Sequence, residues 1–426
     1  MCEARGIVDE VKEYRALRSM TRFRCLGGAC EDPCCRQWQI PVDEPHYRAI
    51  AAALGDSADG QRELARMVRK LPVVDQRPDR VGDIRFRDDG FCVMLDEDKL
   101  CSLHRRFGED VLADTCATYP RAINQLGVRL EMSGMTSCPE VVRMSLLTED
   151  GVDVVPLDPA RVPRRQLLLE LADPNQARFS EIREFLIGLM RLPFSLATRQ
   201  MFVGAFAHRT AGYLARGQTP ADAHLDGTLA SMRDPAVLEA LHRSFVESSF
   251  DPGFAATVVL AVLEAEPWPI GGNFARLIER VISRYAPARK GGALEPRRVW
   301  AMFHKRRDDL PAHLMARMDL YVRNFAISNL YQEWYTAYPS LVDFVQIHLI
   351  QCAVIQFLLV SHPETSRACK EPAAEGLARF DGAVVECVSY FSRAAHHSQG
   401  LGQRIALRLA ARGLDTPAHT YALATM

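Results

Sequence analysis

The sequence predicts a mainly α-helical protein, with a small cysteine-rich α+β domain at its N-terminus followed by an irregular all-α domain. Three observations predict this class. Eight of the twelve cysteines lie in one window that ends at residue 138 of a 426-residue chain. Within that window, alternating apolar residues over 84–103 predict a short β-meander. Beyond residue 165, apolar residues recur at three- and four-residue spacing almost to the end, which is typical of packed helices.

Short helices are expected around the first cysteines. A helical pattern covers 9–20. After Trp38, Asp43 is placed to cap a helix N-terminus, and Pro45 lies in the first turn of that helix, where a missing backbone N–H costs little. Three more helices of the first domain are expected over 60–70, 104–114 and 139–147.

The β-meander would bring two thiols together. Its strands are expected at 84–87, 91–95 and 100–103, and a further strand at 128–133. Asp89–Gly90 is a favoured turn between the first two strands. Because side chains alternate across a strand, a second loop of two or four residues would place Cys92 and Cys101 on one face, and a loop of three would separate them. With an even-length loop, the two sulfurs make half of a metal site.

A proline-rich segment separates the two predicted domains. Three prolines interrupt any periodicity over 151–165. We therefore expect a cysteine-rich metal-cluster domain over 1–150, a linker over 151–165 and a helical domain over 166–426. The helices of the last domain are expected at 181–190, 196–214, 235–245, 254–264, 274–285, 313–335, 341–360, 377–397 and 401–412.

Charge and hydropathy exclude several classes of partner. Lysine plus arginine number 52 and aspartate plus glutamate 53, with no long run of one sign, so neither nucleic acid nor an anionic membrane surface is expected. The first twenty residues are charged throughout and lack the apolar core of a signal peptide. The most apolar stretch, 342–360, is interrupted by five polar residues, which indicates a buried helix rather than a membrane span. We therefore expect a cytoplasmic protein.

The clustered thiols are candidate metal ligands. Structural disulfides are rare in a reducing cytosol, so clustered cysteines there are more often metal ligands or redox groups. Reversible disulfides and unligated buried thiols are the alternatives. The eight candidates are Cys25, Cys30, Cys34, Cys35, Cys92, Cys101, Cys116 and Cys138.

The spacing of these thiols favours an iron–sulfur centre over zinc. Structural zinc is often held by two pairs of the CxxC type, and no CxxC occurs in this chain. Iron–sulfur clusters accept more varied spacing, and four thiolates hold one [4Fe–4S] centre. Eight thiols could hold two centres, or one centre with thiols to spare. Since neighbouring side chains diverge, we expect at least one of Cys34 and Cys35 to do something else.

Two common cofactor motifs are incomplete. Cys30-x3-Cys34 begins the cysteine pattern of radical enzymes that use S-adenosylmethionine, but position 37 is glutamine. Gly27–Gly28 lacks the third glycine and the preceding strand of a dinucleotide-binding turn. These motifs leave the site of any nucleotide-like cofactor open.

Four motifs in the first third carry a family resemblance. They are Cys25-x4-Cys30-Glu-Asp-x-Cys34-Cys35-Arg-x-Trp38, Cys92-x8-Cys101, Asp114-Thr-Cys116-Ala-Thr-Tyr-Pro-Arg121 and Ser137-Cys138-Pro-Glu140. They resemble the bacterial flagellin lysine-N-methylase family, whose cysteine-rich part is similar to a wider group of small proteins with a CxxxCxxCC-like metal-chelating signature. Segments 321–330, 344–360 and 391–397 have the look of the same family, so the resemblance covers most of the chain. Gln37 stands where the family commonly has glycine.

The resemblance implies a methyltransferase that uses S-adenosylmethionine to methylate lysine ε-amines on flagellin. It also implies an essential [4Fe–4S] cluster on the cysteines and a helical domain that recognises the protein substrate. Tyr119 and Arg121 lie beside a candidate ligand thiol, which makes them the candidate catalytic residues lining the donor pocket. Alternatively, they form hydrogen bonds that fix the cluster loop.

Two rival functions remain open beside the methyltransferase. One is a non-catalytic protein in which zinc or iron staples a loop-rich domain and the helices form a binding module. The other is a redox or electron-transfer iron–sulfur protein. All three require sulfurs that are distant along the chain to converge in space.

Overall fold

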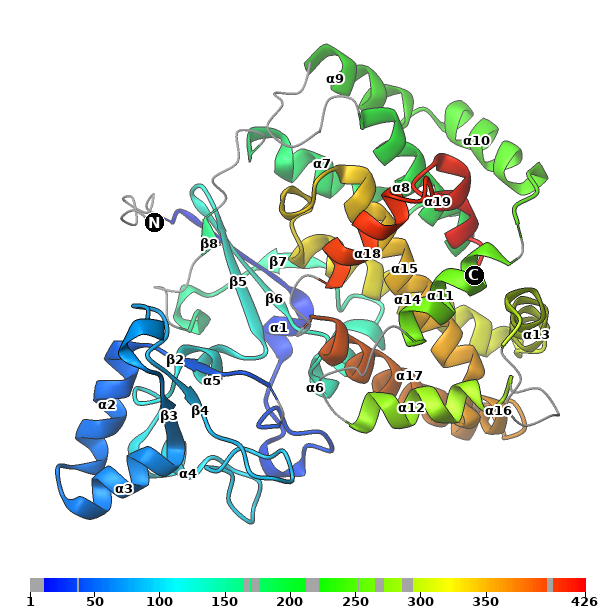
Figure 1. The fold of residues 1–426 in the computed structure, drawn as a ribbon. Helices are drawn as coiled ribbons and strands as arrows, with labels where there is room; N and C mark the ends of the chain where they lie inside the picture. Colours follow the sequence, from blue (N-terminus) through cyan, green and yellow to red (C-terminus); the bar gives the residue numbers. More distant parts are fainter. Residues whose placement is uncertain are drawn as a thin grey trace.

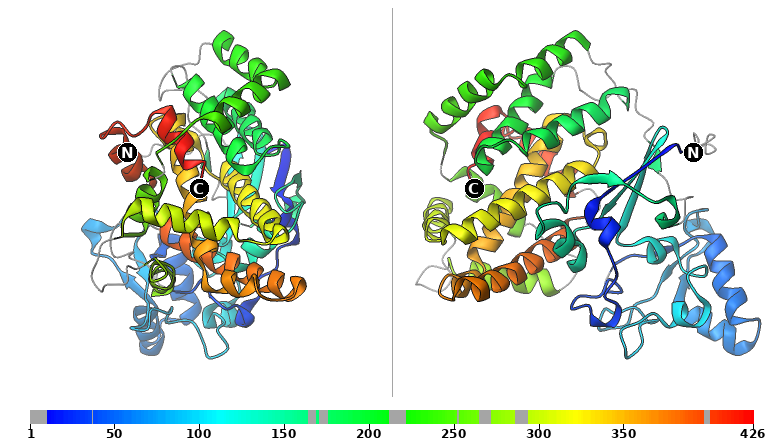
Figure 2. Two further views of the ribbon diagram at one scale, coloured as in Figure 1. Left: turned by 90° about the vertical axis from the view of Figure 1, so that its right-hand side faces the viewer. Right: turned by 180° about the vertical axis from the view of Figure 1, so that it is seen from behind.

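The computed structural model describes residues 11–36, 38–163, 169–170, 176–211, 222–251, 253–264, 272–285, 294–396 and 401–426. These residues form a mainly α-helical structure with a small α+β part near the N-terminus, so the predicted fold class is confirmed. Figure 1 shows the cysteine-rich part in blue and cyan beside the helical part in green to red. A mixed sheet lies between them, and the view from behind in Figure 2 shows the same arrangement.

The larger sheet has five strands in the order β7-β1-β6-β5-β8. They are β1 (Glu13–Leu17), β5 (Arg121–Leu126), β6 (Arg129–Gly134), β7 (Val154–Pro156) and β8 (Leu169–Glu170). Strands β5 and β6 form a hairpin in which Leu126 faces Arg129, and the loop between them begins with Gly127 at φ +55°. A positive φ at that position matches the turns that suit the twist of a hairpin. β6 confirms the strand expected at 128–133, and β5 was not predicted.

The helix expected over 9–20 is wrong for Glu13–Leu17, which form strand β1. This strand pairs in parallel with β6 and antiparallel with β7, so its backbone groups are satisfied by segments far along the chain. The helix here, α1, covers Arg18–Arg22. Residues 9 and 10 of the prediction lie outside the described residues.

A small three-stranded sheet supports the cysteine-rich part. It contains β2 (Pro41–Val42), β4 (Gly82–Ile84) and β3 (Val68–Lys70) in that order, next to helices α2 (Glu44–Leu54) and α3 (Ala58–Met67). Asp43 caps α2 as expected, because its side chain accepts a hydrogen bond from the backbone N–H of His46 at 2.9 Å. The helix predicted over 60–70 is α3, and its last three residues instead form β3.

The meander is present as isolated antiparallel bridges rather than as continuous strands. Phe86 pairs with Cys92, and Leu95 pairs with Cys101. The turn at Asp89–Gly90 is confirmed, with Gly90 at φ +83°. The second loop covers 96–100, so it has neither of the even lengths considered. Both thiols nevertheless reach the same cavity, because the backbone does not follow a regular pleat here.

Three short helices precede the helical part: α4 (Ser102–Phe107), α5 (Asp114–Thr118) and α6 (Pro139–Leu146). The helix expected over 104–114 begins two residues earlier and ends at Phe107. It ends there because Gly108 adopts φ +84°, a left-handed conformation that favours glycine. The helix expected over 139–147 is α6.

The described residues from 176 onward are mostly helical. Their helices are α7 (Gln176–Leu189), α8 (Leu196–Thr210), α9 (Asp222–Ser231), α10 (Pro235–Glu247), α11 (Phe254–Glu264), α12 (Gly272–Ile282), α13 (Pro296–Asp308), α14 (Ala312–Gln332), α15 (Leu341–Ser361), α16 (Pro363–Ala368), α17 (Ala373–His396), α18 (Leu401–Ala410) and α19 (Pro417–Leu423). Every helix expected in this part is found within a few residues at its ends. Residues 212–214 and 397 of those predictions lie outside the described residues. Helices α9, α13, α16 and α19 were not predicted.

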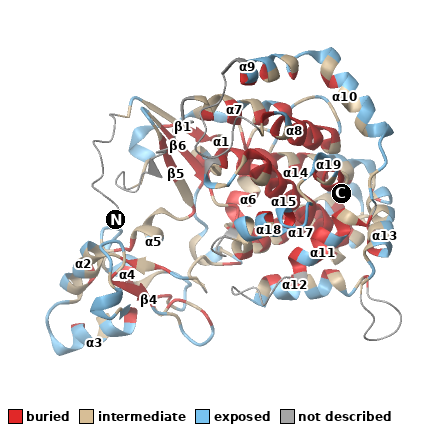
Figure 3. Cartoon of the chain, turned by 45° about the horizontal axis from the view of Figure 1, so that its top comes forward, coloured by how far each residue is buried: buried red, intermediate tan, exposed pale blue. Residues whose placement is uncertain are grey.

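Helix α15 lies at the centre of the helical part, where Figure 3 shows the buried residues concentrated. It packs against α8, α11, α14 and α17. By length and composition α15 could cross a membrane, but 94% of its most apolar window is buried inside the fold, as expected for a core helix. Strand β7 lies within the segment expected as a linker, and the domain boundary stays a prediction.

Candidate metal centre

One cavity of about 330 Å³ is lined by all eight clustered thiols. Four of them come from the loop over 25–35, and the other four come from four separate segments of the chain: Cys92, Cys101, Cys116 and Cys138. The structure therefore brings together the sulfurs that the metal hypothesis requires. Their role as ligands stays a prediction.

Glycines let the first cysteine loop pack closely against the 96–100 loop. Gly27 adopts φ +55° and begins a single 3-10 turn between Cys25 and Cys30. A side chain at Gly28 would place its Cβ 2.3 Å from the backbone oxygen of Asp98. The end of the loop is held from another side, because the backbone N–H of Cys92 donates to the carbonyl oxygen of Cys35 at 2.9 Å.

Backbone N–H groups point at two of the sulfurs, and helix N-termini lie beside two others. Cys101 precedes α4 and Cys138 precedes α6, and in both places N–H groups of the first helical turn oppose the rise in thiol pKa that burial causes. The N–H of Gly27 lies 3.4 Å from Cys25 Sγ, and the N–H of Met94 lies 3.5 Å from Cys92 Sγ. Hydrogen bonds of this kind favour the thiolate, which is the form that binds metal.

Burial and mutual repulsion oppose charge on most of these thiols. Burial raises the pKa of Cys92 to about 11 and the pKa of Cys138 to about 12. The pKa of Cys34 is instead lowered to about 7, chiefly by a hydrogen bond from the neighbouring Cys35 thiol and also by the positive charge of Arg393. The same hydrogen bond, together with burial, raises the pKa of Cys35. A bound cation would offset the repulsion between thiolates as they lose their protons.

Cys34 and Cys35 lie closer together than their adjacency in sequence suggested. Both side chains line the cavity, and each thiol shifts the pKa of the other. The backbone here is irregular, so the two side chains do not diverge as they would in a strand or helix.

Arg393 connects the helical part to the cysteine cavity. It lies near the end of α17, lines the cavity and forms an ion pair with Asp32 at 2.9 Å. Asp32 is almost fully buried between Cys30 and Cys34. The Arg393 guanidinium also donates to the carbonyl oxygen of Asp32 and to that of Ser137, beside Cys138, both at 3.3 Å. One cation therefore fixes two cysteine-bearing segments relative to α17.

Tyr119 and Arg121 both line the cavity, as the sequence suggested. The Tyr119 hydroxyl lies 3.0 Å from Ser137 Oγ, and its ring meets the Trp38 ring edge-on at 5.3 Å between centroids. Burial raises the pKa of Tyr119. The Arg121 guanidinium lies over the Phe23 ring, 5.4 Å from its centroid. These contacts fit the loop-fixing alternative, and a catalytic role for either residue stays a prediction.

Sequence reasoning missed Asp32, Ser137 and Arg393. Asp32 and Ser137 lie inside the cysteine motifs, so their position beside the thiols gave a signal. Arg393 lies 361 residues from Asp32, so its signal was only the family likeness of segment 391–397. A further contact secures Cys116: His46 in α2 lies 3.5 Å from Asp114, at the start of the helix that carries this cysteine.

The donor set fits an iron–sulfur group. The eleven cysteines that the structure describes are all free thiols. Eight sulfurs with N–H donors around them and an arginine beside them match what such clusters use, namely thiolate ligands tuned by hydrogen bonds and charge. Oxygen-seeking cations such as magnesium fit poorly, because the cavity is dominated by soft sulfur donors.

Curated relatives are similar to part of the chain. The lysine-N-methylase of Salmonella typhimurium is 30% identical over 134 residues, which is 31% of this chain and 32% of that protein. The flagellar biosynthetic protein FliU of Salmonella muenchen is 29% identical over 134 residues, covering 76% of its length. The lysine-N-methylase of Salmonella choleraesuis is 29% identical over 32% of its length. The match therefore spans about a third of two of these relatives.

Over these 134 residues the relatives confirm the resemblance to the flagellin lysine-N-methylase family, and the resemblance over most of the chain stays a prediction. No protein-family model matches the chain. No solved structure matches it either.

Proposed function

We propose that this chain is a protein-lysine N-methyltransferase that acts on flagellin in the cytoplasm and uses S-adenosylmethionine as methyl donor. The observation that carries the proposal is the single cavity lined by all eight clustered thiols. The similarity to proteins named lysine-N-methylase gives that cavity a reaction class. The name of a flagellar biosynthetic protein among the relatives supports flagellin as the substrate.

A [4Fe–4S] cluster would be held by four of the thiols that line the cavity. Such a cluster supplies either a Lewis-acidic iron or an electron to a bound methyl donor. The chain's own contribution is to present thiolates, supply backbone N–H donors to Cys25 and Cys92, and shield most of the other sulfurs from solvent. Arg393 adds a fixed positive charge beside Cys34 and offsets part of the negative charge that the thiolates bring.

The acceptor must be a neutral amine. A lysine ε-ammonium has no lone pair, so it must lose a proton before it attacks an electrophilic methyl group. Burial or a nearby cation lowers the pKa of a lysine. The cysteine cavity offers burial and two guanidinium groups, that of Arg121 and that of Arg393, which is paired with Asp32.

The test is to purify the full chain anaerobically, assay iron and sulfide, and incubate it with flagellin and S-adenosylmethionine labelled in its methyl group. We expect iron and sulfide in comparable amounts, and label on flagellin lysines by mass spectrometry. Flagellin with acetylated lysines is the matched control and should stay unlabelled. Removing the metal by chelation should abolish the labelling.

The rival functions give different results in the same experiment. Bound zinc with no labelling would support a metal-stapled binding protein. A cluster that cycles between redox states without methyl transfer would support an electron-transfer protein. Either result would overturn the proposed function.

A further inference from the structure

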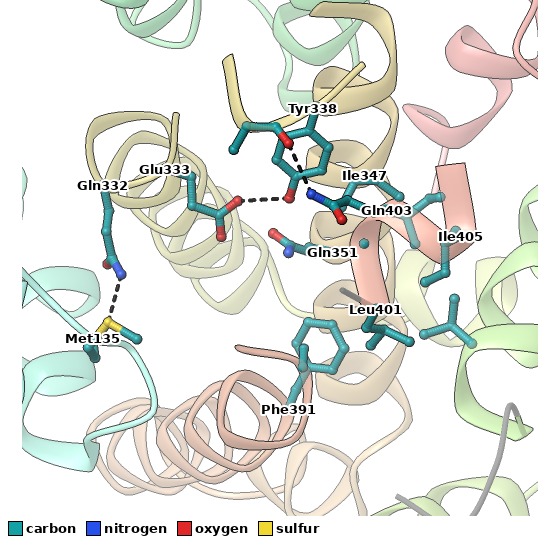
Figure 4. A pocket seen from close by; sticks show the side chains of 15 residues that line it. Met135, Gln332, Glu333, Tyr338, Ile347, Gln351, Phe391, Leu401, Gln403 and Ile405 are labelled. Carbon is teal, nitrogen blue, oxygen red and sulfur yellow. Dashed lines mark hydrogen bonds between the residues drawn. The ribbon is translucent and has the colours of Figure 1, made fainter. Parts of the chain in front are cut away.

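A second cavity, of about 310 Å³, lies on the helical side of the cysteine cavity. Figure 4 shows its lining residues, which come from the loop before α6, from α11, from the end of α14 and the following turn, and from α15, α17 and α18. They are Met135, Val262, Gln332, Glu333, Ala337, Tyr338, Ile347, Ile350, Gln351, Phe391, Ala395, Leu401, Gly402, Gln403 and Ile405. Ala337 and Gln403 are exposed, so the cavity reaches the surface.

The two cavities share a wall made of residues 135–138 and 391–395. Met135 lines the second cavity, and Cys138 lines the cysteine cavity. On α17, Phe391 and Ala395 line the second cavity, whereas Arg393 lines the first. Within the wall the Thr136 hydroxyl donates to Ser392 Oγ at 2.9 Å. A group bound in the second cavity would therefore lie next to the thiol site.

Hydrogen-bond acceptors gather at one end of the second cavity. The Tyr338 hydroxyl donates to the Glu333 carboxylate at 3.3 Å, and the Gln403 amide N–H donates to the carbonyl oxygen of Ala337 at 3.0 Å. With its hydroxyl hydrogen engaged, Tyr338 presents oxygen lone pairs beside the carboxylate, and Gln403 presents its amide oxygen together with its second N–H. Figure 4 shows these three side chains pointing toward one another.

Apolar side chains form most of the remaining wall, beside the amides of Gln332 and Gln351, and the charge of the cavity is negative. Side chains of Ile347, Phe391, Leu401 and Ile405 form its walls. Among the described lining residues, Glu333 carries the single charge, and no lysine, arginine or histidine is present. A ligand with an aliphatic stem and a cationic head rich in N–H groups matches both ends. An ammonium has three donors and no acceptor, whereas a sulfonium has no donor to offer these oxygens.

We propose that this cavity binds a lysine side chain of the protein substrate, with Glu333 as the counter-charge and the apolar walls around the stem. This inference rests on the proposed function for the identity of the partner. It adds a docking contact: this lysine is held as its ammonium outside the thiol cavity, and it is distinct from the lysine that loses its proton and reacts beside the thiols.

The experiment measures binding without any methyl donor. The full chain is titrated by calorimetry with a flagellin peptide that contains one lysine, and with the same peptide carrying norleucine, which keeps the stem and lacks the ammonium. We expect the lysine peptide to bind about tenfold or more tightly, because hydrogen bonds to a charged group are lost in the norleucine peptide. Glu333→Gln should weaken binding of the lysine peptide by a similar factor and leave the norleucine peptide unchanged.

Glu375→Gln is the matched control, because Glu375 is exposed at the start of α17 and lies outside the cavity. It should bind both peptides as the parent does. A circular-dichroism melt of each variant shows that it is folded. Equal affinity for the two peptides, or an unchanged affinity in Glu333→Gln, would overturn the proposal. A competition titration gives a further test. If S-adenosylmethionine displaces the peptide from the parent but not from Glu333→Gln, the donor occupies this cavity and the proposal is overturned.

The outcomes separate this proposal from the proposed function. If no methyl transfer occurs but Glu333-dependent lysine binding does, the cavity proposal stands and the enzyme assignment fails. If methyl transfer occurs and the norleucine peptide binds equally well, the enzyme assignment stands and lysine is recognised elsewhere.

Discussion

Helix α15 and the cysteine cavity occupy the centres of two regions that are filled in different ways. Around α15, apolar side chains of α8, α14 and α17 close the core from several sides. The main apolar cluster of the cysteine-rich part has eleven buried side chains among the described residues, and one of them is Cys92. Figure 3 shows the contrast, with α14, α15 and α17 largely buried and α2, α3 and α4 largely intermediate or exposed.

This difference indicates what stabilises each region. A small region buries a smaller fraction of its surface than a large one, so it gains less from the hydrophobic effect. Apolar contacts provide most of the stability of the helical part. The cysteine-rich part depends more on its ion pairs and on whatever its thiols bind, and metal sites of this kind contribute folding free energy directly.

The largest expected effect comes from replacing a thiol in each region. Cys92→Ser should remove roughly half or more of the bound iron, because four thiolates hold one centre, and it should abolish methyl transfer. Cys352→Ser is the matched control: this thiol is equally buried, but it lies in α15 away from the cavity. It should keep its iron and its activity. Iron and sulfide assays on both variants check this, and equal iron in the two proteins would contradict the proposed centre.

A smaller but still large effect is expected at the ion pair between Arg393 and Asp32. Arg393→Met leaves a buried carboxylate without its partner, which should lower the free energy of unfolding by about 3–5 kcal/mol. Arg379→Met is the control, because Arg379 pairs with Glu364 and Glu371 on the surface, where ion pairs contribute less than about 1 kcal/mol.

Urea denaturation of both variants at neutral pH measures the difference. The double variant Asp32→Asn with Arg393→Met should recover part of the loss, since the unpaired charge is gone. Similar losses in Arg393→Met and Arg379→Met would show that the link between α17 and the cysteine loops adds little to stability.

The same contrast explains what the sequence could predict. Helices in the apolar part follow from local periodicity, so each of those expected was found. The cysteine-rich part is built from pairings between distant segments. Glu13–Leu17 reads locally as a helix but becomes β1 because β6 and β7 flank it. The convergence of the thiols was predictable because cysteines cluster in the sequence. The contact between Arg393 and Asp32 joins residues far apart along the chain, so local patterns could not predict it.

A titrating group inside the apolar core gives a third prediction. His348 in α15 is fully buried, neither of its ring nitrogens has a hydrogen-bond partner within the described residues, and burial lowers its pKa to about 4. The folded state therefore prefers the neutral ring. Stability from this preference is complete above pH 6.5 and is lost as the pH falls from 6.5 toward 4, by up to about 3 kcal/mol.

His348→Leu removes this dependence. Parent and variant are compared by urea denaturation between pH 7.5 and 4. The contributions of other titrating groups then cancel in the difference between the two free energies of unfolding. As the pH falls, the free energy of unfolding of the variant should rise relative to that of the parent by up to about 3 kcal/mol. A constant difference between the two proteins would mean that His348 finds a partner or water in solution.

The smallest expected effect is at Tyr119, where the two interpretations of the cavity separate. If its hydroxyl only fixes the loop through Ser137, then Tyr119→Phe and Ser137→Ala remove the same hydrogen bond. Each should cost about 1 kcal/mol of stability. Both should change the rate of methyl transfer by less than about tenfold, because loss of a general acid or base would lower the rate roughly 10²–10⁴-fold.

Turnover and urea denaturation are measured on both variants. We expect matched, small losses, which would make Tyr119 part of the scaffold that holds Cys138 near Cys116. A loss of turnover above a hundredfold in Tyr119→Phe, with Ser137→Ala unaffected, would instead place the hydroxyl in the reaction.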